Sequence, residues 1–241
     1  MIMTTHSKRL IALTALAAAA AACDENGSPS ELDRARVLAI QISPPHLSPE
    51  ETASVRVLVG TSDGRVSEEE AGGVKVVGAP PGSPASGMVG RGADGWAISC
   101  PGPDELAQLR ADMELGPEDP IPIALAVDVE VEGTVLSATK YVYLGSDGDN
   151  PQVAGISIGG GTEEDGTVLL RVGDAIPIAA EGAAGDTELS YAWFTAVGDI
   201  DLYLSEEATL TLEAAGEGPL VLIVRDERGG VSWTSRDVRV E

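Results

Sequence analysis

Cysteine, histidine, aromatic residues and basic residues are all scarce in this chain of 241 residues. It contains 2 cysteines, 2 histidines and 3% aromatic residues, and 15 Lys and Arg stand against 39 Asp and Glu, which gives a formal net charge of -24. The missing basic surface excludes nucleic-acid binding, because phosphate neutralisation requires one. It also disfavours direct adsorption to anionic lipid headgroups. With only two cysteines the fold does not depend on disulfides, so the chain has to bury ordinary hydrophobic cores, and it is long enough for two domains.

Groups for catalysis are equally few. His46 is the one histidine beyond residue 22, so a Ser-His-Asp or Cys-His arrangement has to use it. The neighbours of Cys100 offer no cationic group and no helix N-terminus that would lower the pKa of its thiol. This favours a structural role for Cys100 as a small buried side chain. A catalytic Cys100–His46 pair stays open as the alternative. One His and one Cys cannot form a zinc site without carboxylates. The glycines at 159–161 lack the spacing and the Lys of a phosphate loop. The sequence therefore predicts no enzyme and no cofactor.

The first residues form a secretory signal. Lys8 and Arg9 precede an apolar run from Leu10 to Ala22, and Cys23 follows it directly. Residues 20–23 (Ala-Ala-Ala-Cys) resemble a bacterial lipobox, with Ala20 in place of the usual Leu. The resemblance implies that residues 1–22 are cleaved and that Cys23 carries the lipid chains, which together form a stable anchor. The alternative is an ordinary cleaved signal peptide with an incidental cysteine nearby.

The residues after Cys23 are polar, and we expect a disordered tether over 23–33 because this segment has little apolar surface to bury. The expected location is the cell envelope, with the protein anchored to the inner or the outer membrane and facing the periplasm or the outside. Asp24 resembles an inner-membrane retention signal of some bacteria. The choice of membrane therefore stays open.

Beyond the tether, apolar residues recur at every second position, the pattern of half-buried strands. The clearest run is 121–132, which a Glu-Gly turn joins to 135–144 and which therefore indicates a hairpin. We predict an all-β fold of two tandem antiparallel sandwiches. The other predicted strands are 35–42, 54–59, 74–77, 95–99, 153–158, 167–172, 175–179, 188–195, 200–204, 208–212, 220–225 and 231–240.

One segment has helical periodicity. Leu106, Leu109 and Met113 lie on one face of a helix over 103–113, for which Asp104 is a candidate N-cap. The sequence therefore predicts one short helix that crosses between two strands of the first sandwich.

Two segments of the second half resemble immunoglobulin-like domains, in particular those of the polycystic-kidney-disease type (PKD-like). Tyr-Ala-Trp-Phe at 191–194 resembles their central tryptophan strand, and 220–233 resembles their final hairpin. In this hairpin Asp226 begins the turn, and Gly229 and Gly230 suit positive φ. The PKD signature Trp-Asp-Phe-Gly-Asp-Gly is absent, which makes the domain a diverged relative. Alternation places Tyr191 and Trp193 on one face of the tryptophan strand, which predicts that Trp193 is a core residue.

The opening of the first half, around 36–40 with the prolines that follow, resembles bacterial lipoproteins built from the same modules. The predicted organisation is a lipoprotein signal peptide at 1–22, a tether at 23–33, a diverged immunoglobulin-like sandwich at 34–145, a linker at 146–151, and an immunoglobulin-like or PKD-like sandwich at 152–241.

The linker carries the one candidate ion site. Asp147, Asp149 and Asn150 could supply oxygen ligands to calcium, which takes several such ligands. The same residues also suit an ordinary turn-rich hinge, and no bidentate Glu stands in register. We therefore expect no metal, with these three residues as weak calcium candidates. A plain hinge predicts that each domain unfolds on its own.

These features predict a membrane-anchored envelope lipoprotein that acts as a non-enzymatic binding or spacer module. Its partners are the lipid anchor in the membrane and another envelope protein. A carbohydrate- or polymer-binding surface protein is the first alternative, although Trp96, Trp193 and Trp233 all lie in strand-like contexts that favour burial. A calcium-rigidified adhesion module is the second alternative. Fold resemblance alone does not identify the ligand.

Overall fold

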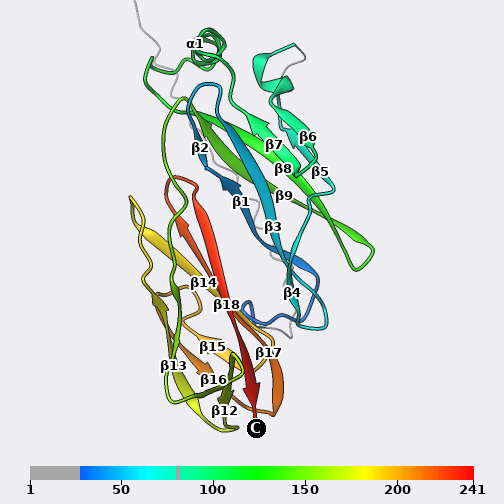
Figure 1. Cartoon of the computed structure of the whole chain (residues 1–241), viewed down its shortest axis with the longest axis vertical. Coiled ribbons are helices and arrows are strands. Elements are labelled where there is room, and N and C mark those ends of the chain that lie inside the picture. Colours follow the sequence, from blue (N-terminus) through cyan, green and yellow to red (C-terminus); the bar gives the residue numbers. More distant parts are fainter. Residues whose placement is uncertain (1–27, 80–81) are drawn as a thin grey trace, which may run out of the picture.

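The computed structural model describes residues 28–79 and 82–241, which form two β-sandwiches (Figure 1). The first contains β1 (Arg36–Ser43), β2 (His46–Leu47), β3 (Thr52–Gly60), β4 (Val66–Glu69), β5 (Gly73–Val76), the 3-10 helix η1 (Pro84–Gly87), β6 (Val89–Gly92), β7 (Gly95–Ser99), α1 (Pro103–Asp112), β8 (Ile121–Val131) and β9 (Thr134–Leu144). The second contains β10 (Gly155–Ile158), β11 (Thr162–Glu164), β12 (Thr167–Leu170), β13 (Ala175–Glu181), β14 (Leu189–Thr195), β15 (Asp199–Asp201), β16 (Glu207–Thr211), β17 (Gly216–Asp226) and β18 (Val231–Val240).

Both sandwiches have the strand order of an immunoglobulin-like fold. In the first, β1-β3-β7-β6 faces β2-β9-β8-β5, and in the second β10-β13-β16-β15 faces β11-β12-β18-β17-β14. These orders correspond to strands A-B-E-D in one sheet and to G-F-C in the other. The pairing is antiparallel except where the short strands β2 and β12 lie parallel to β9 and β18. The structure confirms the predicted all-β fold of two tandem immunoglobulin-like sandwiches.

Alternating side chains produce two hydrophobic cores. In β8, every second residue from Ile121 to Val131 is buried in the core of the first sandwich, and Asp128 and Glu130 are on the other face. Trp193 in β14 is 0% exposed in the core of the second sandwich, where its indole N–H donates to the carbonyl of Ser205 at 2.8 Å. The predicted tryptophan strand is therefore a core element.

The one predicted helix is α1, which lies at the end of the first sandwich far from the second (Figure 1). Leu106 and Leu109 are buried. The proposed cap is wrong, because the N-cap residue is Gly102, whose N–H donates to the Glu105 carboxylate at 3.2 Å, whereas Asp104 lies inside the first turn. No helix within the described residues is long and apolar enough to cross a bilayer.

The prediction of a disordered tether is wrong for residues 28–33. Ser30 and Leu32 are 0% and 3% exposed. Glu31 forms a parallel bridge with Thr195 at the end of β14, where the Leu32 N–H donates to the Thr195 carbonyl at 2.8 Å. The error arose because one apolar residue, Leu32, suffices here to dock a polar segment onto a strand that still has free backbone groups. The signal peptide, the lipobox and Cys23 lie outside the described residues.

Candidate functional site

The two sandwiches are joined by a third apolar cluster, which we call the seam. Its members from the second sandwich include Val221 and Ile223, both 0% exposed, and those from the first include Leu38 and Leu58. Residues of the docked N-terminal segment complete it. The buried members are Leu32, Leu38, Ala39, Leu58, Val221, Ile223 and Val231.

Strand β17 is buried on both of its faces. Leu220, Leu222 and Val224 belong to the core of the second sandwich, while Val221 and Ile223 point the opposite way into the seam. At about 25 cal/mol per Å² of apolar surface, covering a whole sheet face contributes several kcal/mol. The first sandwich is thus packed laterally on its neighbour. It is not connected to it by the linker alone.

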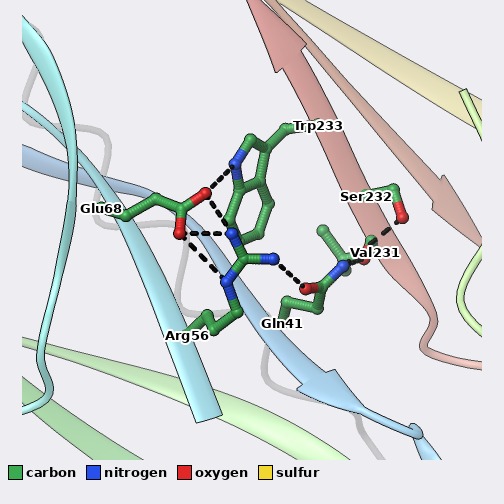
Figure 2. A network of polar contacts seen from close by, with 6 residues as sticks. All are labelled: Gln41, Arg56, Glu68, Val231, Ser232 and Trp233. Atoms are coloured by element: carbon green, nitrogen blue, oxygen red, sulfur yellow. Dashed lines mark hydrogen bonds and ion pairs between the residues drawn. The ribbon is translucent and has the colours of Figure 1, made fainter. Parts of the chain in front are cut away.

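A polar network, which we call the latch, borders the seam (Figure 2). The Arg56 side chain donates to Glu68 at 3.0 Å and to the Gln41 amide oxygen at 3.2 Å, and its guanidinium lies 5.2 Å from the centre of the Trp233 ring. Trp233 donates its indole N–H to Glu68 at 3.1 Å, and Gln41 donates to the Val231 carbonyl at 2.7 Å. The latch therefore ties three elements of the first sandwich to β18.

The latch also lines a polar cleft of about 520 Å³ between the sandwiches. Because Arg56, Glu68, Gln41 and Trp233 already bond to one another, they have few groups left for a ligand. The Arg56–Glu68 pair is about half exposed, so the ion pair by itself contributes little stability. The arrangement fits a connection between domains better than a binding site.

Cationic side chains cross the seam to backbone carbonyls. Arg225 donates to the Leu38 carbonyl at 3.0 Å, and Lys140 donates to the Gly229 carbonyl. In a chain of net charge -24, positive groups at this position reduce the repulsion between two acidic bodies. Gly64 allows a further close approach, because a Cβ there would lie 2.7 Å from the Ala196 Cβ.

Burial, together with the smaller effect of the nearby Arg225 charge, lowers the pKa of Lys140 to about 8, against the opposing effect of Asp226. The unfolded chain therefore binds this proton more tightly than the folded chain does. The free energy of unfolding should rise between about pH 8 and pH 10.5, by at most about 1.4 kcal/mol per pH unit. We expect this contribution to be absent in Lys140→Met, as measured by urea unfolding at several pH values.

The informative quantity is the difference between the pH profiles of the wild type and of Lys140→Met. Cysteine and tyrosine ionisation contributes equally to both profiles and therefore cancels. Lys75→Met is the matched control, since Lys75 is 70% exposed in the first sandwich. A control profile parallel to that of the wild type is expected. Parallel profiles for wild type and Lys140→Met would contradict the burial of a charged Lys140.

Two of the predicted linker residues, Asp147 and Asn150, form hydrogen bonds with the sandwiches on either side. Asn150 accepts from the Val231 N–H at 2.8 Å and donates to the Ile42 carbonyl at 2.9 Å, which joins both sandwiches. The Asp147 carboxylate accepts from the Ser48 hydroxyl, and its carbonyl accepts from Arg228 at 2.8 Å. Asp149 is exposed. These contacts hold the chain between the sandwiches, which differs from the plain hinge that its composition suggested.

The calcium candidates do not form a ligand cluster. Among the described residues, no group of three or more His, Cys, Asp or Glu could hold a metal ion. Asn150 already uses both ends of its amide, and Asp147 is engaged by Ser48. Direct packing and hydrogen bonds connect the two sandwiches.

His46 and Cys100 each bind other partners. The His46 ring nitrogens lie 2.8 Å from the Ser146 hydroxyl and 2.9 Å from the Arg228 carbonyl, and the ring stacks on Tyr143 at 4.9 Å. Burial, followed by the charge of Arg228, lowers the pKa of His46. Cys100 is 5% exposed and donates to the Leu47 carbonyl at 3.5 Å, and burial raises its pKa. Neither side chain is available to activate the other.

The remaining sequence-predicted positions have structural roles. The glycines at 159–161 join β10 to β11, and the Gly159 N–H donates to the Pro177 carbonyl at 2.9 Å. The acidic run 163–165 contributes two residues to the exposed strand β11. In the final hairpin Gly229 has φ +88°, whereas Gly230 has no positive φ and donates to the Asp226 carboxylate at 2.6 Å.

Sequence reasoning missed the seam, although β17 carries a signal of it. Residues 220–224 are a continuous apolar run of five, and strands covered on both faces have such runs in place of alternation. The same is true of 37–40 in β1, where Leu38 and Ala39 enter the seam and Ile40 enters the first core. The latch carries no comparable signal, because its members are far apart in the sequence.

No family model and no curated protein matches this sequence. Solved structures of tandem modules align over most of the chain. The N-terminal Ig1-2 module of the Drosophila receptor protein tyrosine phosphatase DLAR is 13% identical, with 86% of this chain and 99% of that chain covered and a TM-score of 0.30. Murine CEACAM1b is 11% identical, with 86% and 100% covered and a TM-score of 0.28. Fibronectin(III)-like modules of Clostridium thermocellum CbhA are 9% identical, with 86% and 92% covered and a TM-score of 0.28. These superpositions are loose, so the fold assignment rests on the strand orders given above.

Proposed function

We propose that this chain is a lipid-anchored cell-envelope lipoprotein whose two sandwiches form one rigid, non-enzymatic binding or spacer module. The observation that carries the proposal is the seam, which buries the outer face of β17 and leaves Ile223 with 0% exposure. A flexible tandem would expose that face to water. A rigid one presents its surfaces in a fixed relation to one another, which suits recognition of a second envelope protein.

The anchor is proposed at Cys23 from the basic and apolar residues that precede it. The docked residues 28–32 add a geometric consequence. The five residue-to-residue steps from Cys23 to Ser28 span at most about 18 Å, even when fully extended. Because this segment docks at Thr195 beside the seam, the lipid would hold this side of the molecule close to the bilayer.

The non-enzymatic part of the proposal rests on what the chemically capable side chains do. His46 and Cys100 bind neighbouring groups, and the cleft at the latch is lined by groups that bond to one another. A carbohydrate site would need exposed aromatic rings, yet Trp193 is buried and Trp96 and Trp233 donate their indole N–H groups to protein oxygens. Tyr141, 51% exposed, is the one aromatic side chain in the exposed class among residues 28–79 and 82–241. No observation therefore favours the polymer-binding alternative.

Replacing the anchor residue tests the proposal. We expect Cys23→Ser, expressed with a C-terminal tag in a bacterium, to leave the membrane fraction and to migrate differently from the wild type, because the lipid chains are the proposed means of attachment. Cell fractionation and gel mobility measure both effects. The matched control is Cys100→Ser, which should remain in the membrane fraction. Unchanged fractionation and mobility of Cys23→Ser would refute the lipid anchor.

A further inference from the structure

The sheet of the second sandwich that faces away from the seam carries a shallow groove. The groove has a volume of about 460 Å³ and crosses the outer face of β10, β13 and β16. Small residues form its floor. Ser157 lies beside Ala179, and Pro177 lies beside Thr209 in the antiparallel register. The first sandwich packs on the opposite sheet, so its described residues leave this face uncovered.

Two leucines project from the loop at one side of this groove. Leu202 lines the groove and is 71% exposed, and Leu204 is 61% exposed. Two large aliphatic side chains that are this exposed on one short loop mark an interaction surface more often than a single one does.

The leucine loop is fixed in place. The backbone N–H of the buried Trp193 donates to the Tyr203 carbonyl at 2.9 Å, and its indole N–H donates to the Ser205 carbonyl at 2.8 Å. The Ser205 N–H donates back to the Leu202 carbonyl at 2.8 Å, and Leu202 has φ +59°. A preorganised loop loses little conformational entropy when a partner binds it.

The charge of this face is of one sign. Asp199, Asp201 and Glu207 are exposed on the same strands, and Glu207 lines the groove. The four strands of this sheet contain no Lys and no Arg. A partner segment that placed an aliphatic side chain between these carboxylates would need basic residues on either side, because their positive charge complements the negative potential of this face.

We propose that this groove, with Leu202 at its edge and the exposed Leu204 on the same loop, docks a basic polypeptide segment of a partner protein that inserts aliphatic side chains. The inference deepens the proposed binding function and rests on it. It is independent of the lipid anchor, because the groove lies wholly within the second sandwich. Loss of membrane attachment in Cys23→Ser and loss of peptide binding at the groove are therefore separate results.

The test uses the chain from Cys23 onward, which retains every described residue, labelled with nitrogen-15. Three synthetic peptides serve as probes: lysines flanking two leucines, the same peptide with serine in place of leucine, and the same peptide with glutamate in place of lysine. We expect the lysine–leucine peptide to shift the amide signals of Ala179, Leu202 and Thr209. The other two peptides should bind at least about tenfold more weakly, because the serine peptide lacks the aliphatic side chains and the glutamate peptide lacks the positive charges.

The double variant Leu202→Ser/Leu204→Ser should also weaken binding of the lysine–leucine peptide by about tenfold or more. Both leucines are exposed, so this variant should keep the wild-type signal of Trp193. The control is Val135→Ser, a change at a side chain 65% exposed in the first sandwich, which should bind like the wild type. Equal affinity for the serine peptide, signal shifts spread over the acidic surface, or full binding by the double variant would overturn the proposal.

Discussion

Ile223→Asp is expected to uncouple the two sandwiches. Ile223 is 0% exposed in the seam, on the face of β17 opposite to the core of its own sandwich. A carboxylate there cannot stay buried without a partner, so the seam has to open while the second core remains packed. We expect the loss of about 3 kcal/mol or more of unfolding free energy and the replacement of one unfolding transition by two.

Differential scanning calorimetry measures this effect directly. The matched control is Val135→Asp, which introduces the same charge at a position 65% exposed in the first sandwich. The control should stay within about 0.5 kcal/mol of the wild type and keep the wild-type transition. A single transition at the wild-type temperature for Ile223→Asp would mean that the seam contributes nothing to stability.

Trp193→Ala has the second large expected effect. Its ring is fully buried in the second core and its indole N–H donates to the Ser205 carbonyl, so truncation leaves a cavity and an orphaned carbonyl. The expected cost is about 3–5 kcal/mol. This corresponds to a fall in melting temperature of roughly 10 °C for a chain of this size.

Thermal unfolding followed by circular dichroism tests this value. Tyr141→Ala, which removes an aromatic side chain that is 51% exposed, serves as the comparison and should melt close to the wild type. If Trp193→Ala melts within a degree or two of the wild type, Trp193 is not part of the core. The same variant should also loosen the Leu202–Ser205 loop, because it removes the indole N–H that donates to the Ser205 carbonyl.

The parts of the fold that follow local rules could be predicted from the sequence. The alternation in 121–131, the Glu-Gly turn and the spacing of Leu106 and Leu109 predict β8, its hairpin and α1 with boundaries close to those observed. These elements are specified by neighbours along the chain. Short strands such as β2 and β11 were missed, because two or three residues carry no period.

The seam and the latch could not be predicted in the same way. Gln41 bonds to Val231, and Glu68 bonds to Trp233, across more than 160 positions of sequence. No local pattern encodes such a pairing. The polar segment 28–33 was misread for a related reason, since its order depends on the edge of β14 and not on its own composition. The groove at Leu202 was missed because 200–204 was read as a plain strand.

The distance between two spin labels tests most directly whether the tandem is one rigid unit. Labels at Thr139→Cys in β9 and Ser190→Cys in β14 occupy exposed positions, one in each sandwich, in a chain that starts at Asp24 and carries Cys100→Ala. Pulsed electron paramagnetic resonance then reports the distribution of the distance between them. A closed seam predicts a single narrow distribution. A broad distribution, of the kind a free hinge at 146–151 produces, would contradict it.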